Sequence, residues 1–470
     1  MPLRPLFGLA RFGAFILVTL AACATRTQAT KAEPAMTTDT TSAPTQIDHA
    51  VLGDLQFSKW RLPNGLEVIL APDPNAKAVA YTTWFRVGSR NEDEPAGETG
   101  LAHLFEHLMF TQTAGADGDF DRQMEAAGGS SNAMTDVDFT AYINVMPPTE
   151  LLLAVKLESD RMQNLALRGE QIENERQVVI EERLATVEDS VDGRLDELVA
   201  AAAYKTHPYR WPVIGYMDHI KKVPQEAVQR FYRKHYAPNN AVVIVAGKFE
   251  QEAAMATIVA HYGGLQPTQI DPPAAVLEQA PVAAHRTTLA WPVPADKFAM
   301  AVGAPSLGHP DRPAFDVMDA IISMGPGARL HRALVVDGEI ASSADCQVGP
   351  TRENGLYTFW VQMRKGHAAA QGEAAINKLI ADLATTAVPQ AELQRAKNRL
   401  EMDFWVGLSG SEGRAEQLGM YEIGSGSYKT LFSRAEQYER VTAADVQRVA
   451  NTYLVSRPAV IAVATPGEEP

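Results

Sequence analysis

Apolar and polar positions follow two periods along this chain, one typical of strands and one typical of helices. Residues 223–230 carry a helical pattern that begins with a cap signal, and residues 241–246, Ala-Val-Val-Ile-Val-Ala, form an apolar run typical of a buried strand. The same succession returns at residues 441–448 and 459–464, where the strand reads Ala-Val-Ile-Ala-Val-Ala. The pattern therefore predicts an α+β unit that occurs twice, as two tandem homologous domains.

A proline-rich stretch separates the two predicted domains. Residues 266–284 contain Pro267, Pro272, Pro273 and Pro281. Such a composition favours a linker over a helix or a central strand. We therefore expect an N-terminal domain over residues 49–265 and a C-terminal domain over residues 285–470. Domains hinged at residues 266–284 could close over a substrate as a clamshell.

The first residues are typical of a targeting signal. Arg4 and Arg11 precede the apolar run 12–20, which is too short to span a bilayer as a helix and suits the apolar core of a signal peptide. The run leads into Leu-Ala-Ala-Cys23, which is similar to a bacterial lipoprotein signal with an acylated cysteine. The alternative is an ordinary secretory signal peptide followed by an unrelated cysteine. We expect residues 1–22 to be the signal peptide.

An acylated Cys23 would anchor the protein at a membrane, since each buried methylene contributes about 0.8 kcal/mol. Residues 23–48 are rich in Ala, Thr, Pro and Ser, cannot bury a core and are predicted to form a flexible tether. Ala24 stands where an Asp would indicate retention in the inner membrane. These features predict an outer-membrane lipoprotein on the periplasmic side of a bacterial envelope, in contact with the membrane only through its anchor.

Length, cysteine content and charge narrow the classes of protein and of site. The chain has 470 residues, more than one hydrophobic core usually supports, in agreement with two domains. Its only cysteines are Cys23 and Cys346, so after acylation no disulfide is possible and thiolates cannot hold a metal ion. The net charge of −15 argues against nucleic acid as a partner and against charge-driven binding to anionic lipid.

The candidate chemistry lies in an apolar run at residues 100–110. Inside it stands the pentad His103-Leu104-Phe105-Glu106-His107. On a helix the two histidines and Glu106 share one face, so two imidazoles and a carboxylate could meet one metal ion. The order reverses His-Glu-x-x-His and is the motif of inverted zinc hydrolases. The alternative is packed histidines, but three unpaired ionisable groups in an apolar setting would cost on the order of 2 kcal/mol or more each.

A second acidic segment can complete such a site. Residues 172–184 read Ile-Glu-Asn-Glu-Arg-Gln-Val-Val-Ile-Glu-Glu-Arg-Leu, a helical stretch with Glu175 and Glu182 on one face. The pentad followed by this segment resembles the pitrilysin, insulin-degrading enzyme and mitochondrial processing peptidase family. The resemblance implies a zinc site with His103, His107 and Glu182 as ligands and Glu175 as a supporting catalytic residue. The remaining acidic residues here are predicted to form a solvated face: Glu173, Glu181 and Glu188.

The same resemblance implies the activity and the fold. We expect a zinc metalloendopeptidase that binds one Zn²⁺ per chain and hydrolyses extended or unfolded peptides, with Glu106 as the general base. Each domain is expected to be an α/β roll, a mostly antiparallel sheet with packed helices. The helix expected around residues 313–319 lacks the pentad, so the C-terminal domain should have no metal site.

Three further segments resemble segments of the family, and two of them resemble its strand segments around the cleft. Residues 88–92 precede the pentad, and residues 128–142 read as a glycine-rich turn followed by an alternating strand. Such a strand at a sheet edge could pair with an extended peptide, and the resemblance assigns this substrate-binding role to Asn132 and Ala133. The loop at residues 207–215 is predicted to serve packing only.

The chain departs from the family in its second half. Residues 325–334 resemble the family's glycine-rich turn and following helix, but Val335 and Ser342 stand where active single-chain members carry an Arg and a Tyr that hold the substrate carbonyl. Such groups typically contribute about 3 to 4 kcal/mol each to catalysis. We therefore expect a sister subunit to supply them. Arg329 and Arg332 could substitute within the chain, but as helix-surface charges they are weaker candidates.

Two other functions remain open. The chain could be a non-catalytic zinc-containing assembly subunit, although the intact Glu106 argues against this. It could also be a periplasmic zinc-binding lipoprotein, which would be expected to carry a His-rich tract that this sequence lacks. If the chain is an active peptidase, its net negative charge could reflect an acidic chamber that favours basic peptides. It could also reflect a solvated acidic surface.

Overall fold

The computed structural model describes residues 43–113, 119–270, 278 and 281–467. The predicted signal peptide, most of the predicted tether and Cys23 lie outside this part of the chain. The first strand, β1 (Thr45–Leu52), begins before residue 48. The last residues of the segment expected to be a tether (23–48) therefore belong to the fold. No helix in the described residues has the length and apolar character needed to cross a membrane.

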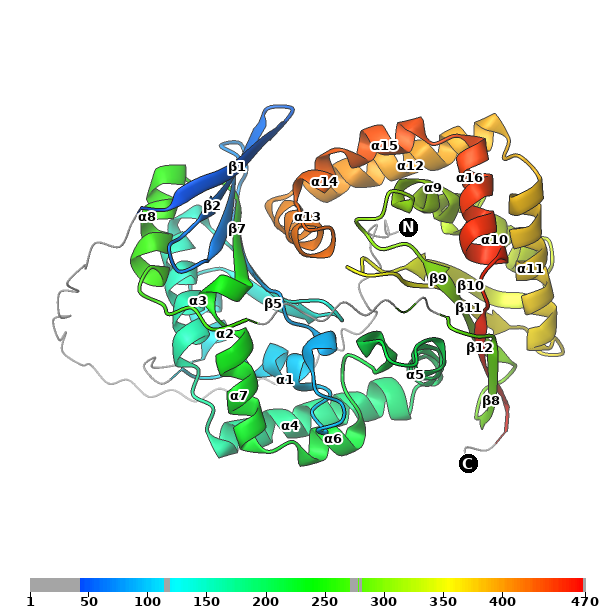
Figure 1. Cartoon of the computed structure of the whole chain (residues 1–470), viewed down its shortest axis with the longest axis horizontal. Coiled ribbons are helices and arrows are strands. Elements are labelled where there is room, and N and C mark those ends of the chain that lie inside the picture. Colours follow the sequence, from blue (N-terminus) through cyan, green and yellow to red (C-terminus); the bar gives the residue numbers. More distant parts are fainter. Residues whose placement is uncertain (1–42, 114–118, 271–277, 279–280, 468–470) are drawn as a thin grey trace.

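The N-terminal half is built on a sheet of seven strands in the order β1-β2-β3-β7-β4-β6-β5 (Figure 1). Only β3 and β7 run parallel, and every other neighbouring pair is antiparallel. After β1, the strands are β2 (Leu55–Arg61), β3 (Glu67–Pro72), β4 (Val79–Phe85), β5 (Ser130–Thr135), β6 (Thr140–Met146) and β7 (Ala241–Gly247). This is the mostly antiparallel sheet that was predicted.

Strands β4 and β7 are buried along their whole length because both faces of the sheet are covered. Along β4, Tyr81 and Phe85 point into the core formed with the helices of the same half, whereas Ala80 and Trp84 point to the opposite face. Two-sided burial explains why residues 241–246 form a continuous apolar run and not an alternating one.

Eight helices of the described residues belong to this half, and all of them except the fifth enclose its main core on one face of the sheet. They are α1 (Leu101–Leu108), α2 (Phe120–Ala126), α3 (Leu151–Asn164), α4 (Gly169–Arg183), α5 (Val191–Ala203), α6 (Met217–Lys222), α7 (Gln225–His235) and α8 (Gln251–Tyr262). Helix α1 lies near β5, and α4 and α6 lie beneath it in Figure 1.

The C-terminal half repeats this plan with five strands in the order β10-β11-β9-β12-β8. They are β8 (His285–Trp291), β9 (Lys297–Ala304), β10 (Ala341–Val348), β11 (Gly355–Met363) and β12 (Val460–Pro466). Strand β12 is parallel to β8 and antiparallel to β9, as β7 is to β3 and β4. The predicted duplication is confirmed, and the N-terminal half differs by the added strands β1 and β2.

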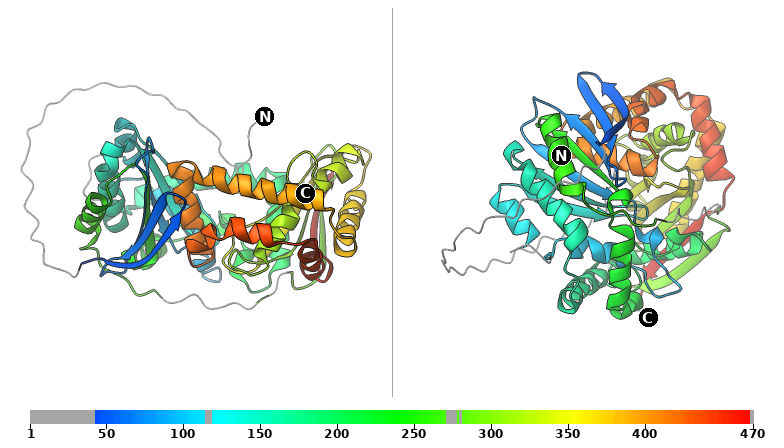
Figure 2. Two further views of the ribbon diagram at one scale, coloured as in Figure 1. Left: turned by 90° about the horizontal axis from the view of Figure 1, so that it is seen from above. Right: turned by 60° about the vertical axis from the view of Figure 1, so that its left-hand side comes forward.

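Most helices of the C-terminal half enclose a second core. The helices of this half are α9 (Arg312–Ser323), α10 (Arg329–His331), α11 (Ala369–Thr385), α12 (Gln390–Leu408), α13 (Ser411–Gly424), α14 (Lys429–Phe432), α15 (Arg434–Arg440) and α16 (Ala443–Val449). The whole chain is an α+β clamshell of two similar domains, and Figure 2 shows α12 running along it.

Each half also covers a sheet of the other half. Helix α13 packs on the outer face of β4 and β7, where the apolar cluster contains Trp84 and Leu418. Helix α5 packs on the sheet of the C-terminal half, where Val199 shares a cluster with Ala462. Because these two clusters are common to both halves, separating the halves would expose the outer faces of both sheets.

Candidate metal centre

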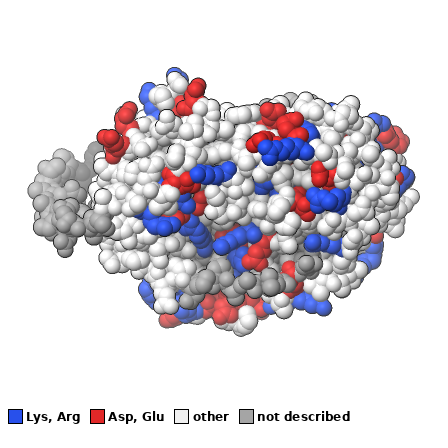
Figure 3. Space-filling model, turned by 45° about the horizontal axis from the view of Figure 1, so that its top comes forward, with Lys and Arg blue, Asp and Glu red and all other residues white. Residues whose placement is uncertain are grey.

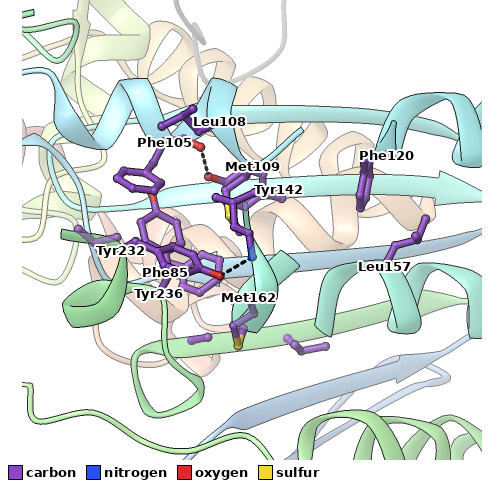
Figure 4. Close-up of a cluster of buried hydrophobic side chains, with 14 of the residues drawn as sticks. Phe85, Phe105, Leu108, Met109, Phe120, Tyr142, Leu157, Met162, Tyr232 and Tyr236 are labelled. Atoms are coloured by element: carbon purple, nitrogen blue, oxygen red, sulfur yellow. Dashed lines mark hydrogen bonds between the residues drawn. The ribbon is translucent and has the colours of Figure 1, made fainter. Parts of the chain in front are cut away.

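Helix α1 carries the pentad, and its own sequence fixes which way it faces. Its apolar side chains are buried around the whole helix, and Phe105 packs on Tyr232 and Tyr236 (Figure 4). The hydroxyl of Tyr142 donates to the Phe105 carbonyl at 3.0 Å, which ties the helix to β6. Glu106 and His107 are the two half-buried residues of the helix. Burial of the other faces therefore turns the polar stripe toward α4.

Helix α4 brings the predicted third ligand to this stripe. Its buried positions, which include Ile172, Val179 and Ile180, recur at helical spacing and anchor one face in the core. Glu175 and Glu182 lie on the neighbouring face, toward α1. Glu181 is exposed, as predicted for the solvated face, and Glu173 extends to solvent with a side chain 57% exposed.

The distances bring the predicted ligands together. Nε2 of His103 lies 3.7 Å from Oε1 of Glu182, and Nε2 of His107 lies 3.3 Å from Oε2 of the same carboxylate. One potential ligand atom from each of these three residues lies within 4.8 Å of the other two. Glu175 stands beside them, with Oε2 at 3.8 Å from Nδ1 of His107. The described residues contain no other such group of three, in either half.

The charges in this centre act on one another. Burial lowers the pKa of His103, although the charges of Glu106 and Glu182 oppose this shift. Burial also opposes the charged form of His107, but its hydrogen bond to Glu182 and the surrounding carboxylates raise its pKa. For Glu182, burial raises the pKa, but the two histidines together lower it by more, so the net shift is downward. Burial and the charge of Asp119 raise the pKa of Glu175. Glu182 is thus ionised and ready to bind a cation.

The donor set fits zinc. Ligands about 2.0 to 2.2 Å from a tetrahedral ion stand about 3.3 to 3.6 Å from one another, and the two contacts of Glu182 lie at or just above this spacing. Two imidazoles and one carboxylate are three protein ligands, which leaves a fourth position for water, as in catalytic zinc sites. Cys346, the one cysteine in the part of the chain that the structure describes, is buried in the other half and lies away from this centre.

The predicted substrate strand lies next to the centre. Within the described residues, strand β5 is the last strand of its sheet and pairs only with β6, and it contacts α1. Asn132 is exposed and faces Ile143 in the register, and Ala133 faces Tyr142. One edge of β5 is therefore open for pairing with an extended chain. The substrate-binding role of Asn132 and Ala133 remains a prediction.

The second half offers no Arg and Tyr from the expected positions. Val335 packs partly against the core of that half, and Ser342 is exposed and donates to the Gln362 carbonyl at 3.2 Å. The two alternative arginines are occupied locally. Arg329 forms two hydrogen bonds with Glu392, and Arg332 forms two with Asp337.

The structure adds two residues that the sequence pattern did not single out. Glu92 accepts hydrogen bonds from the backbone N–H groups of Gly100 and Ala102, both at 2.9 Å, and so holds the first turn of α1. Arg183, next to the predicted ligand Glu182, donates to the Gly215 carbonyl at 2.6 Å. Glu92 lies in the segment 88–92, which resembles a family segment, but no sequence signal indicated its role. No pattern identified Arg183.

The visible face of the molecule carries charges of both signs. On the face in Figure 3, acidic and basic side chains lie beside one another. Many acidic groups are paired, as in the contacts of Lys429 with Asp48 and of Arg286 with Glu373. This pairing favours a solvated, salt-bridged surface as the reading of these charges.

Comparisons with known proteins agree with the centre. The family model described as insulinase (peptidase family M16) matches residues 67–216, and the model described as peptidase M16 inactive domain matches residues 222–400. The first match contains the pentad and Glu182.

Individual relatives are similar over most of their length. The zinc protease PqqE of Helicobacter pylori is 29% identical over 406 residues, which cover 83% of this chain and 89% of that protein. The mitochondrial-processing peptidase subunit beta of Blastocladiella emersonii is 24% identical over 451 residues, 91% of this chain and 92% of that protein. The crystal structure of a protease from Helicobacter pylori superposes with a TM-score of 0.83 at 27% identity and covers 87% of this chain and 99% of that one.

Proposed function

Because the chain belongs to peptidase family M16, whose models match both of its halves, we propose that it is an active zinc metalloendopeptidase that hydrolyses extended or unfolded peptides. The observation that carries this proposal is the meeting of His103, His107 and Glu182 beside an intact Glu106. A relative with a printed name of zinc protease supports the choice of metal.

The residues divide the chemistry among them. His103, His107 and Glu182 would hold the ion, which when bound supplies the Lewis acidity that lets a water molecule lose its proton near neutral pH. Glu106, half-buried on the same face of α1, accepts that proton on its carboxylate and passes it to the leaving amine. Glu175, beside His107, favours the charged imidazole when no cation is present and orients the ring when one is. The open edge of β5 would hold the peptide in extended form.

A non-catalytic assembly subunit is the second candidate. The C-terminal match to a model described as an inactive domain allows it. A structural zinc site, however, has no need of a base beside the metal, and Glu106 is retained. This observation favours the peptidase.

We further propose that the active enzyme contains a sister subunit. Val335 and Ser342 provide no donor comparable to an Arg or a Tyr, and the nearby arginines are engaged with Glu392 and Asp337. Opening one chain between its halves would expose two shared apolar clusters, so a chamber that opens between two chains is favoured. A relative named as a subunit supports this arrangement.

The function is tested by zinc content and peptide cleavage in the complex as isolated. Chelation should abolish cleavage, and added zinc should restore it. Glu106→Gln should retain one zinc per chain and lose on the order of 10²-fold to 10⁴-fold in turnover. Glu181→Gln, an exposed neighbour of the ligand Glu182, is the matched control and should retain both. Retained cleavage in Glu106→Gln would refute the assignment of Glu106 as the base. A wild-type complex that binds zinc but cleaves no peptide would favour the assembly role.

The subunit proposal has its own test. The complex should be purified from its native host through this chain, and the second chain should be sequenced for the Arg and Tyr. The purified single chain should cleave peptides at a small fraction of the rate of the complex. Full activity of the monomer would refute the need for a partner.

A further inference from the structure

Residues 215–223 form a third segment, which contacts both of the helices that carry the proposed metal ligands. This segment follows the loop 207–215, which was assigned to packing only. It lies against α4 on one side and against the start of α1 on the other. Its Ile220 and Val223 lie in the apolar core of this half, and hydrogen bonds to its backbone add directed contacts.

On the α4 side, two arginines bind backbone carbonyls of this segment. Arg183, 2% exposed, donates through Nη1 to the Gly215 carbonyl at 2.6 Å. Its Nε donates to Glu188 and its Nη2 to Glu197, both at 3.0 Å. Arg176, 7% exposed, donates to the carbonyls of Ile220 and of Val223. Each arginine directly follows one of the two carboxylates that face the metal centre, Glu175 and Glu182.

On the α1 side, the contact is between backbones. Gly100, the cap of α1, and Gly215 both adopt positive φ, at 92° and 83°. A Cβ on Gly215 would lie 2.5 Å from the Cα and from the backbone nitrogen of Gly100. Only glycine permits this approach. The Thr99 hydroxyl accepts a hydrogen bond from the Tyr216 nitrogen at 3.0 Å, and Glu92 holds the first turn of α1 from the other side.

A continuous chain of contacts therefore runs from Glu182 to His103: Arg183, the Gly215 carbonyl, the backbone of Gly100 and the first turn of α1. We propose that Arg183 is a positioning residue that sets the place of Glu182 relative to His103 and His107 through its hydrogen bond to Gly215. The inference rests on the proposed zinc site. Neighbours that orient metal ligands in this way typically change affinity about 10-fold to 100-fold when removed.

The test measures zinc affinity and not only activity. The full chain is titrated with zinc against a chromophoric chelator, and the visible absorption of the cobalt-substituted protein reports ligand geometry. Arg183→Met should raise the zinc Kd by about 10-fold or more and alter the cobalt spectrum. Arg183→Lys keeps the charge and one donor and should give an intermediate Kd.

Arg312 provides a matched control in the other half. It is also 2% exposed, and it donates to the carboxylate of Asp316 at 2.6 Å and to the Gly349 carbonyl at 2.9 Å. Arg312→Met should lower the temperature of unfolding while the zinc Kd and the cobalt spectrum stay those of the wild type. A general loss of stability is thereby separated from a displaced ligand.

The possible results separate the positioning role of Arg183 from the proposed zinc peptidase function. A wild-type chain that binds no zinc would refute the proposed function and this inference together. A wild-type chain that binds zinc while Arg183→Met binds it with the same Kd and spectrum would refute this inference alone. If Arg183→Met does not fold, Arg183→Lys decides: a Kd above that of the wild type supports the positioning role, and an unchanged Kd refutes it.

Discussion

Nε2 of His107 on α1 lies 3.3 Å from Oε2 of Glu182 on α4. The two helices meet here through one carboxylate, because Glu182 also approaches His103 at 3.7 Å. Glu175 reaches His107 alone, at 3.8 Å through the opposite ring nitrogen. Glu182 is therefore the residue on α4 whose position serves both histidines.

Replacing Glu182 should remove the metal. Glu182→Gln keeps the shape but loses the negative charge, so we expect the zinc Kd to rise by at least about 100-fold. Glu175→Gln should raise it by about 10-fold or less, because Glu175 stands beside one ring and not among the ligands. Chelator competition measures both values. Equal losses for the two variants would contradict the assignment of Glu182 as the ligand.

Acid should weaken the contact between the halves at Glu67. Burial would raise the pKa of this carboxyl, but its hydrogen bond with Arg61 and the charges of Arg86 and Lys59 lower it from 4.5 to about 2. Lys59 also binds Glu422 of α13 at 2.7 Å, so the cluster joins both halves. A lowered pKa stabilises the fold above the unfolded-state value of about 4.5, and this stability is lost as the pH falls toward about 2.

Glu67→Gln should therefore reduce the free energy of unfolding at pH 7 by on the order of 2 kcal/mol. The difference from the wild type should shrink as the pH falls below about 4.5, because the wild type then loses the same charge. Urea unfolding at pH 7, pH 5 and about pH 3.5 measures it. A difference that stays constant over this range would show that the charge of Glu67 is not what stabilises the cluster.

A methyl group at Gly419 should disturb the packing of α13 on the first sheet. A Cβ at this position would lie 2.0 Å from Cε2 of the buried Trp84, so the helix or the indole must move. We expect Gly419→Ala to cost about 1 to 3 kcal/mol or more in chemical denaturation. Gly407→Ala in α12 is the control, because its Cβ would meet only Gln417, at 3.7 Å, and should be neutral or stabilising.

The predicted anchor can be tested by fractionation. Cys23→Ser should move the protein from the membrane fraction to the soluble fraction of its host, since the acyl chains would be lost. Cys346→Ser leaves Cys23 in place and should leave the protein in the membrane fraction. An unchanged distribution of Cys23→Ser would indicate an ordinary secretory signal peptide or another mode of attachment.

The grouping of the two histidines and Glu106 on one face could be predicted because helical periodicity decides which residues share a face. His103, Glu106 and His107 needed only α1 to be helical, and Glu182 was added by resemblance. The distance between α1 and α4 could not be predicted. It depends on the carbonyls of residues 215–223 and on the contact of Gly215 with Gly100, which no local pattern records.

The duplication was visible as a repeated helix and strand, but the exchange of α5 and α13 between the halves was not. An amphipathic pattern indicates that a helix has an apolar face, but it does not predict which sheet that face will pack against. Residues 45–48 were expected in the tether for a related reason. Strand β1 is held mainly by pairing with β2, and its exposed Ile47 and Val51 give it no burial signal.

The packing of α13 on the first sheet also sets an order for biosynthesis. The strands of the N-terminal half are complete at Gly247, but the helix that covers their outer face ends only at Gly424. During synthesis, an apolar face of the nascent N-terminal half therefore stays exposed until the greater part of the C-terminal half has been made. Holdase chaperones are expected to bind that face until α13 leaves the ribosome, and truncations that end before Ser411 are expected to aggregate.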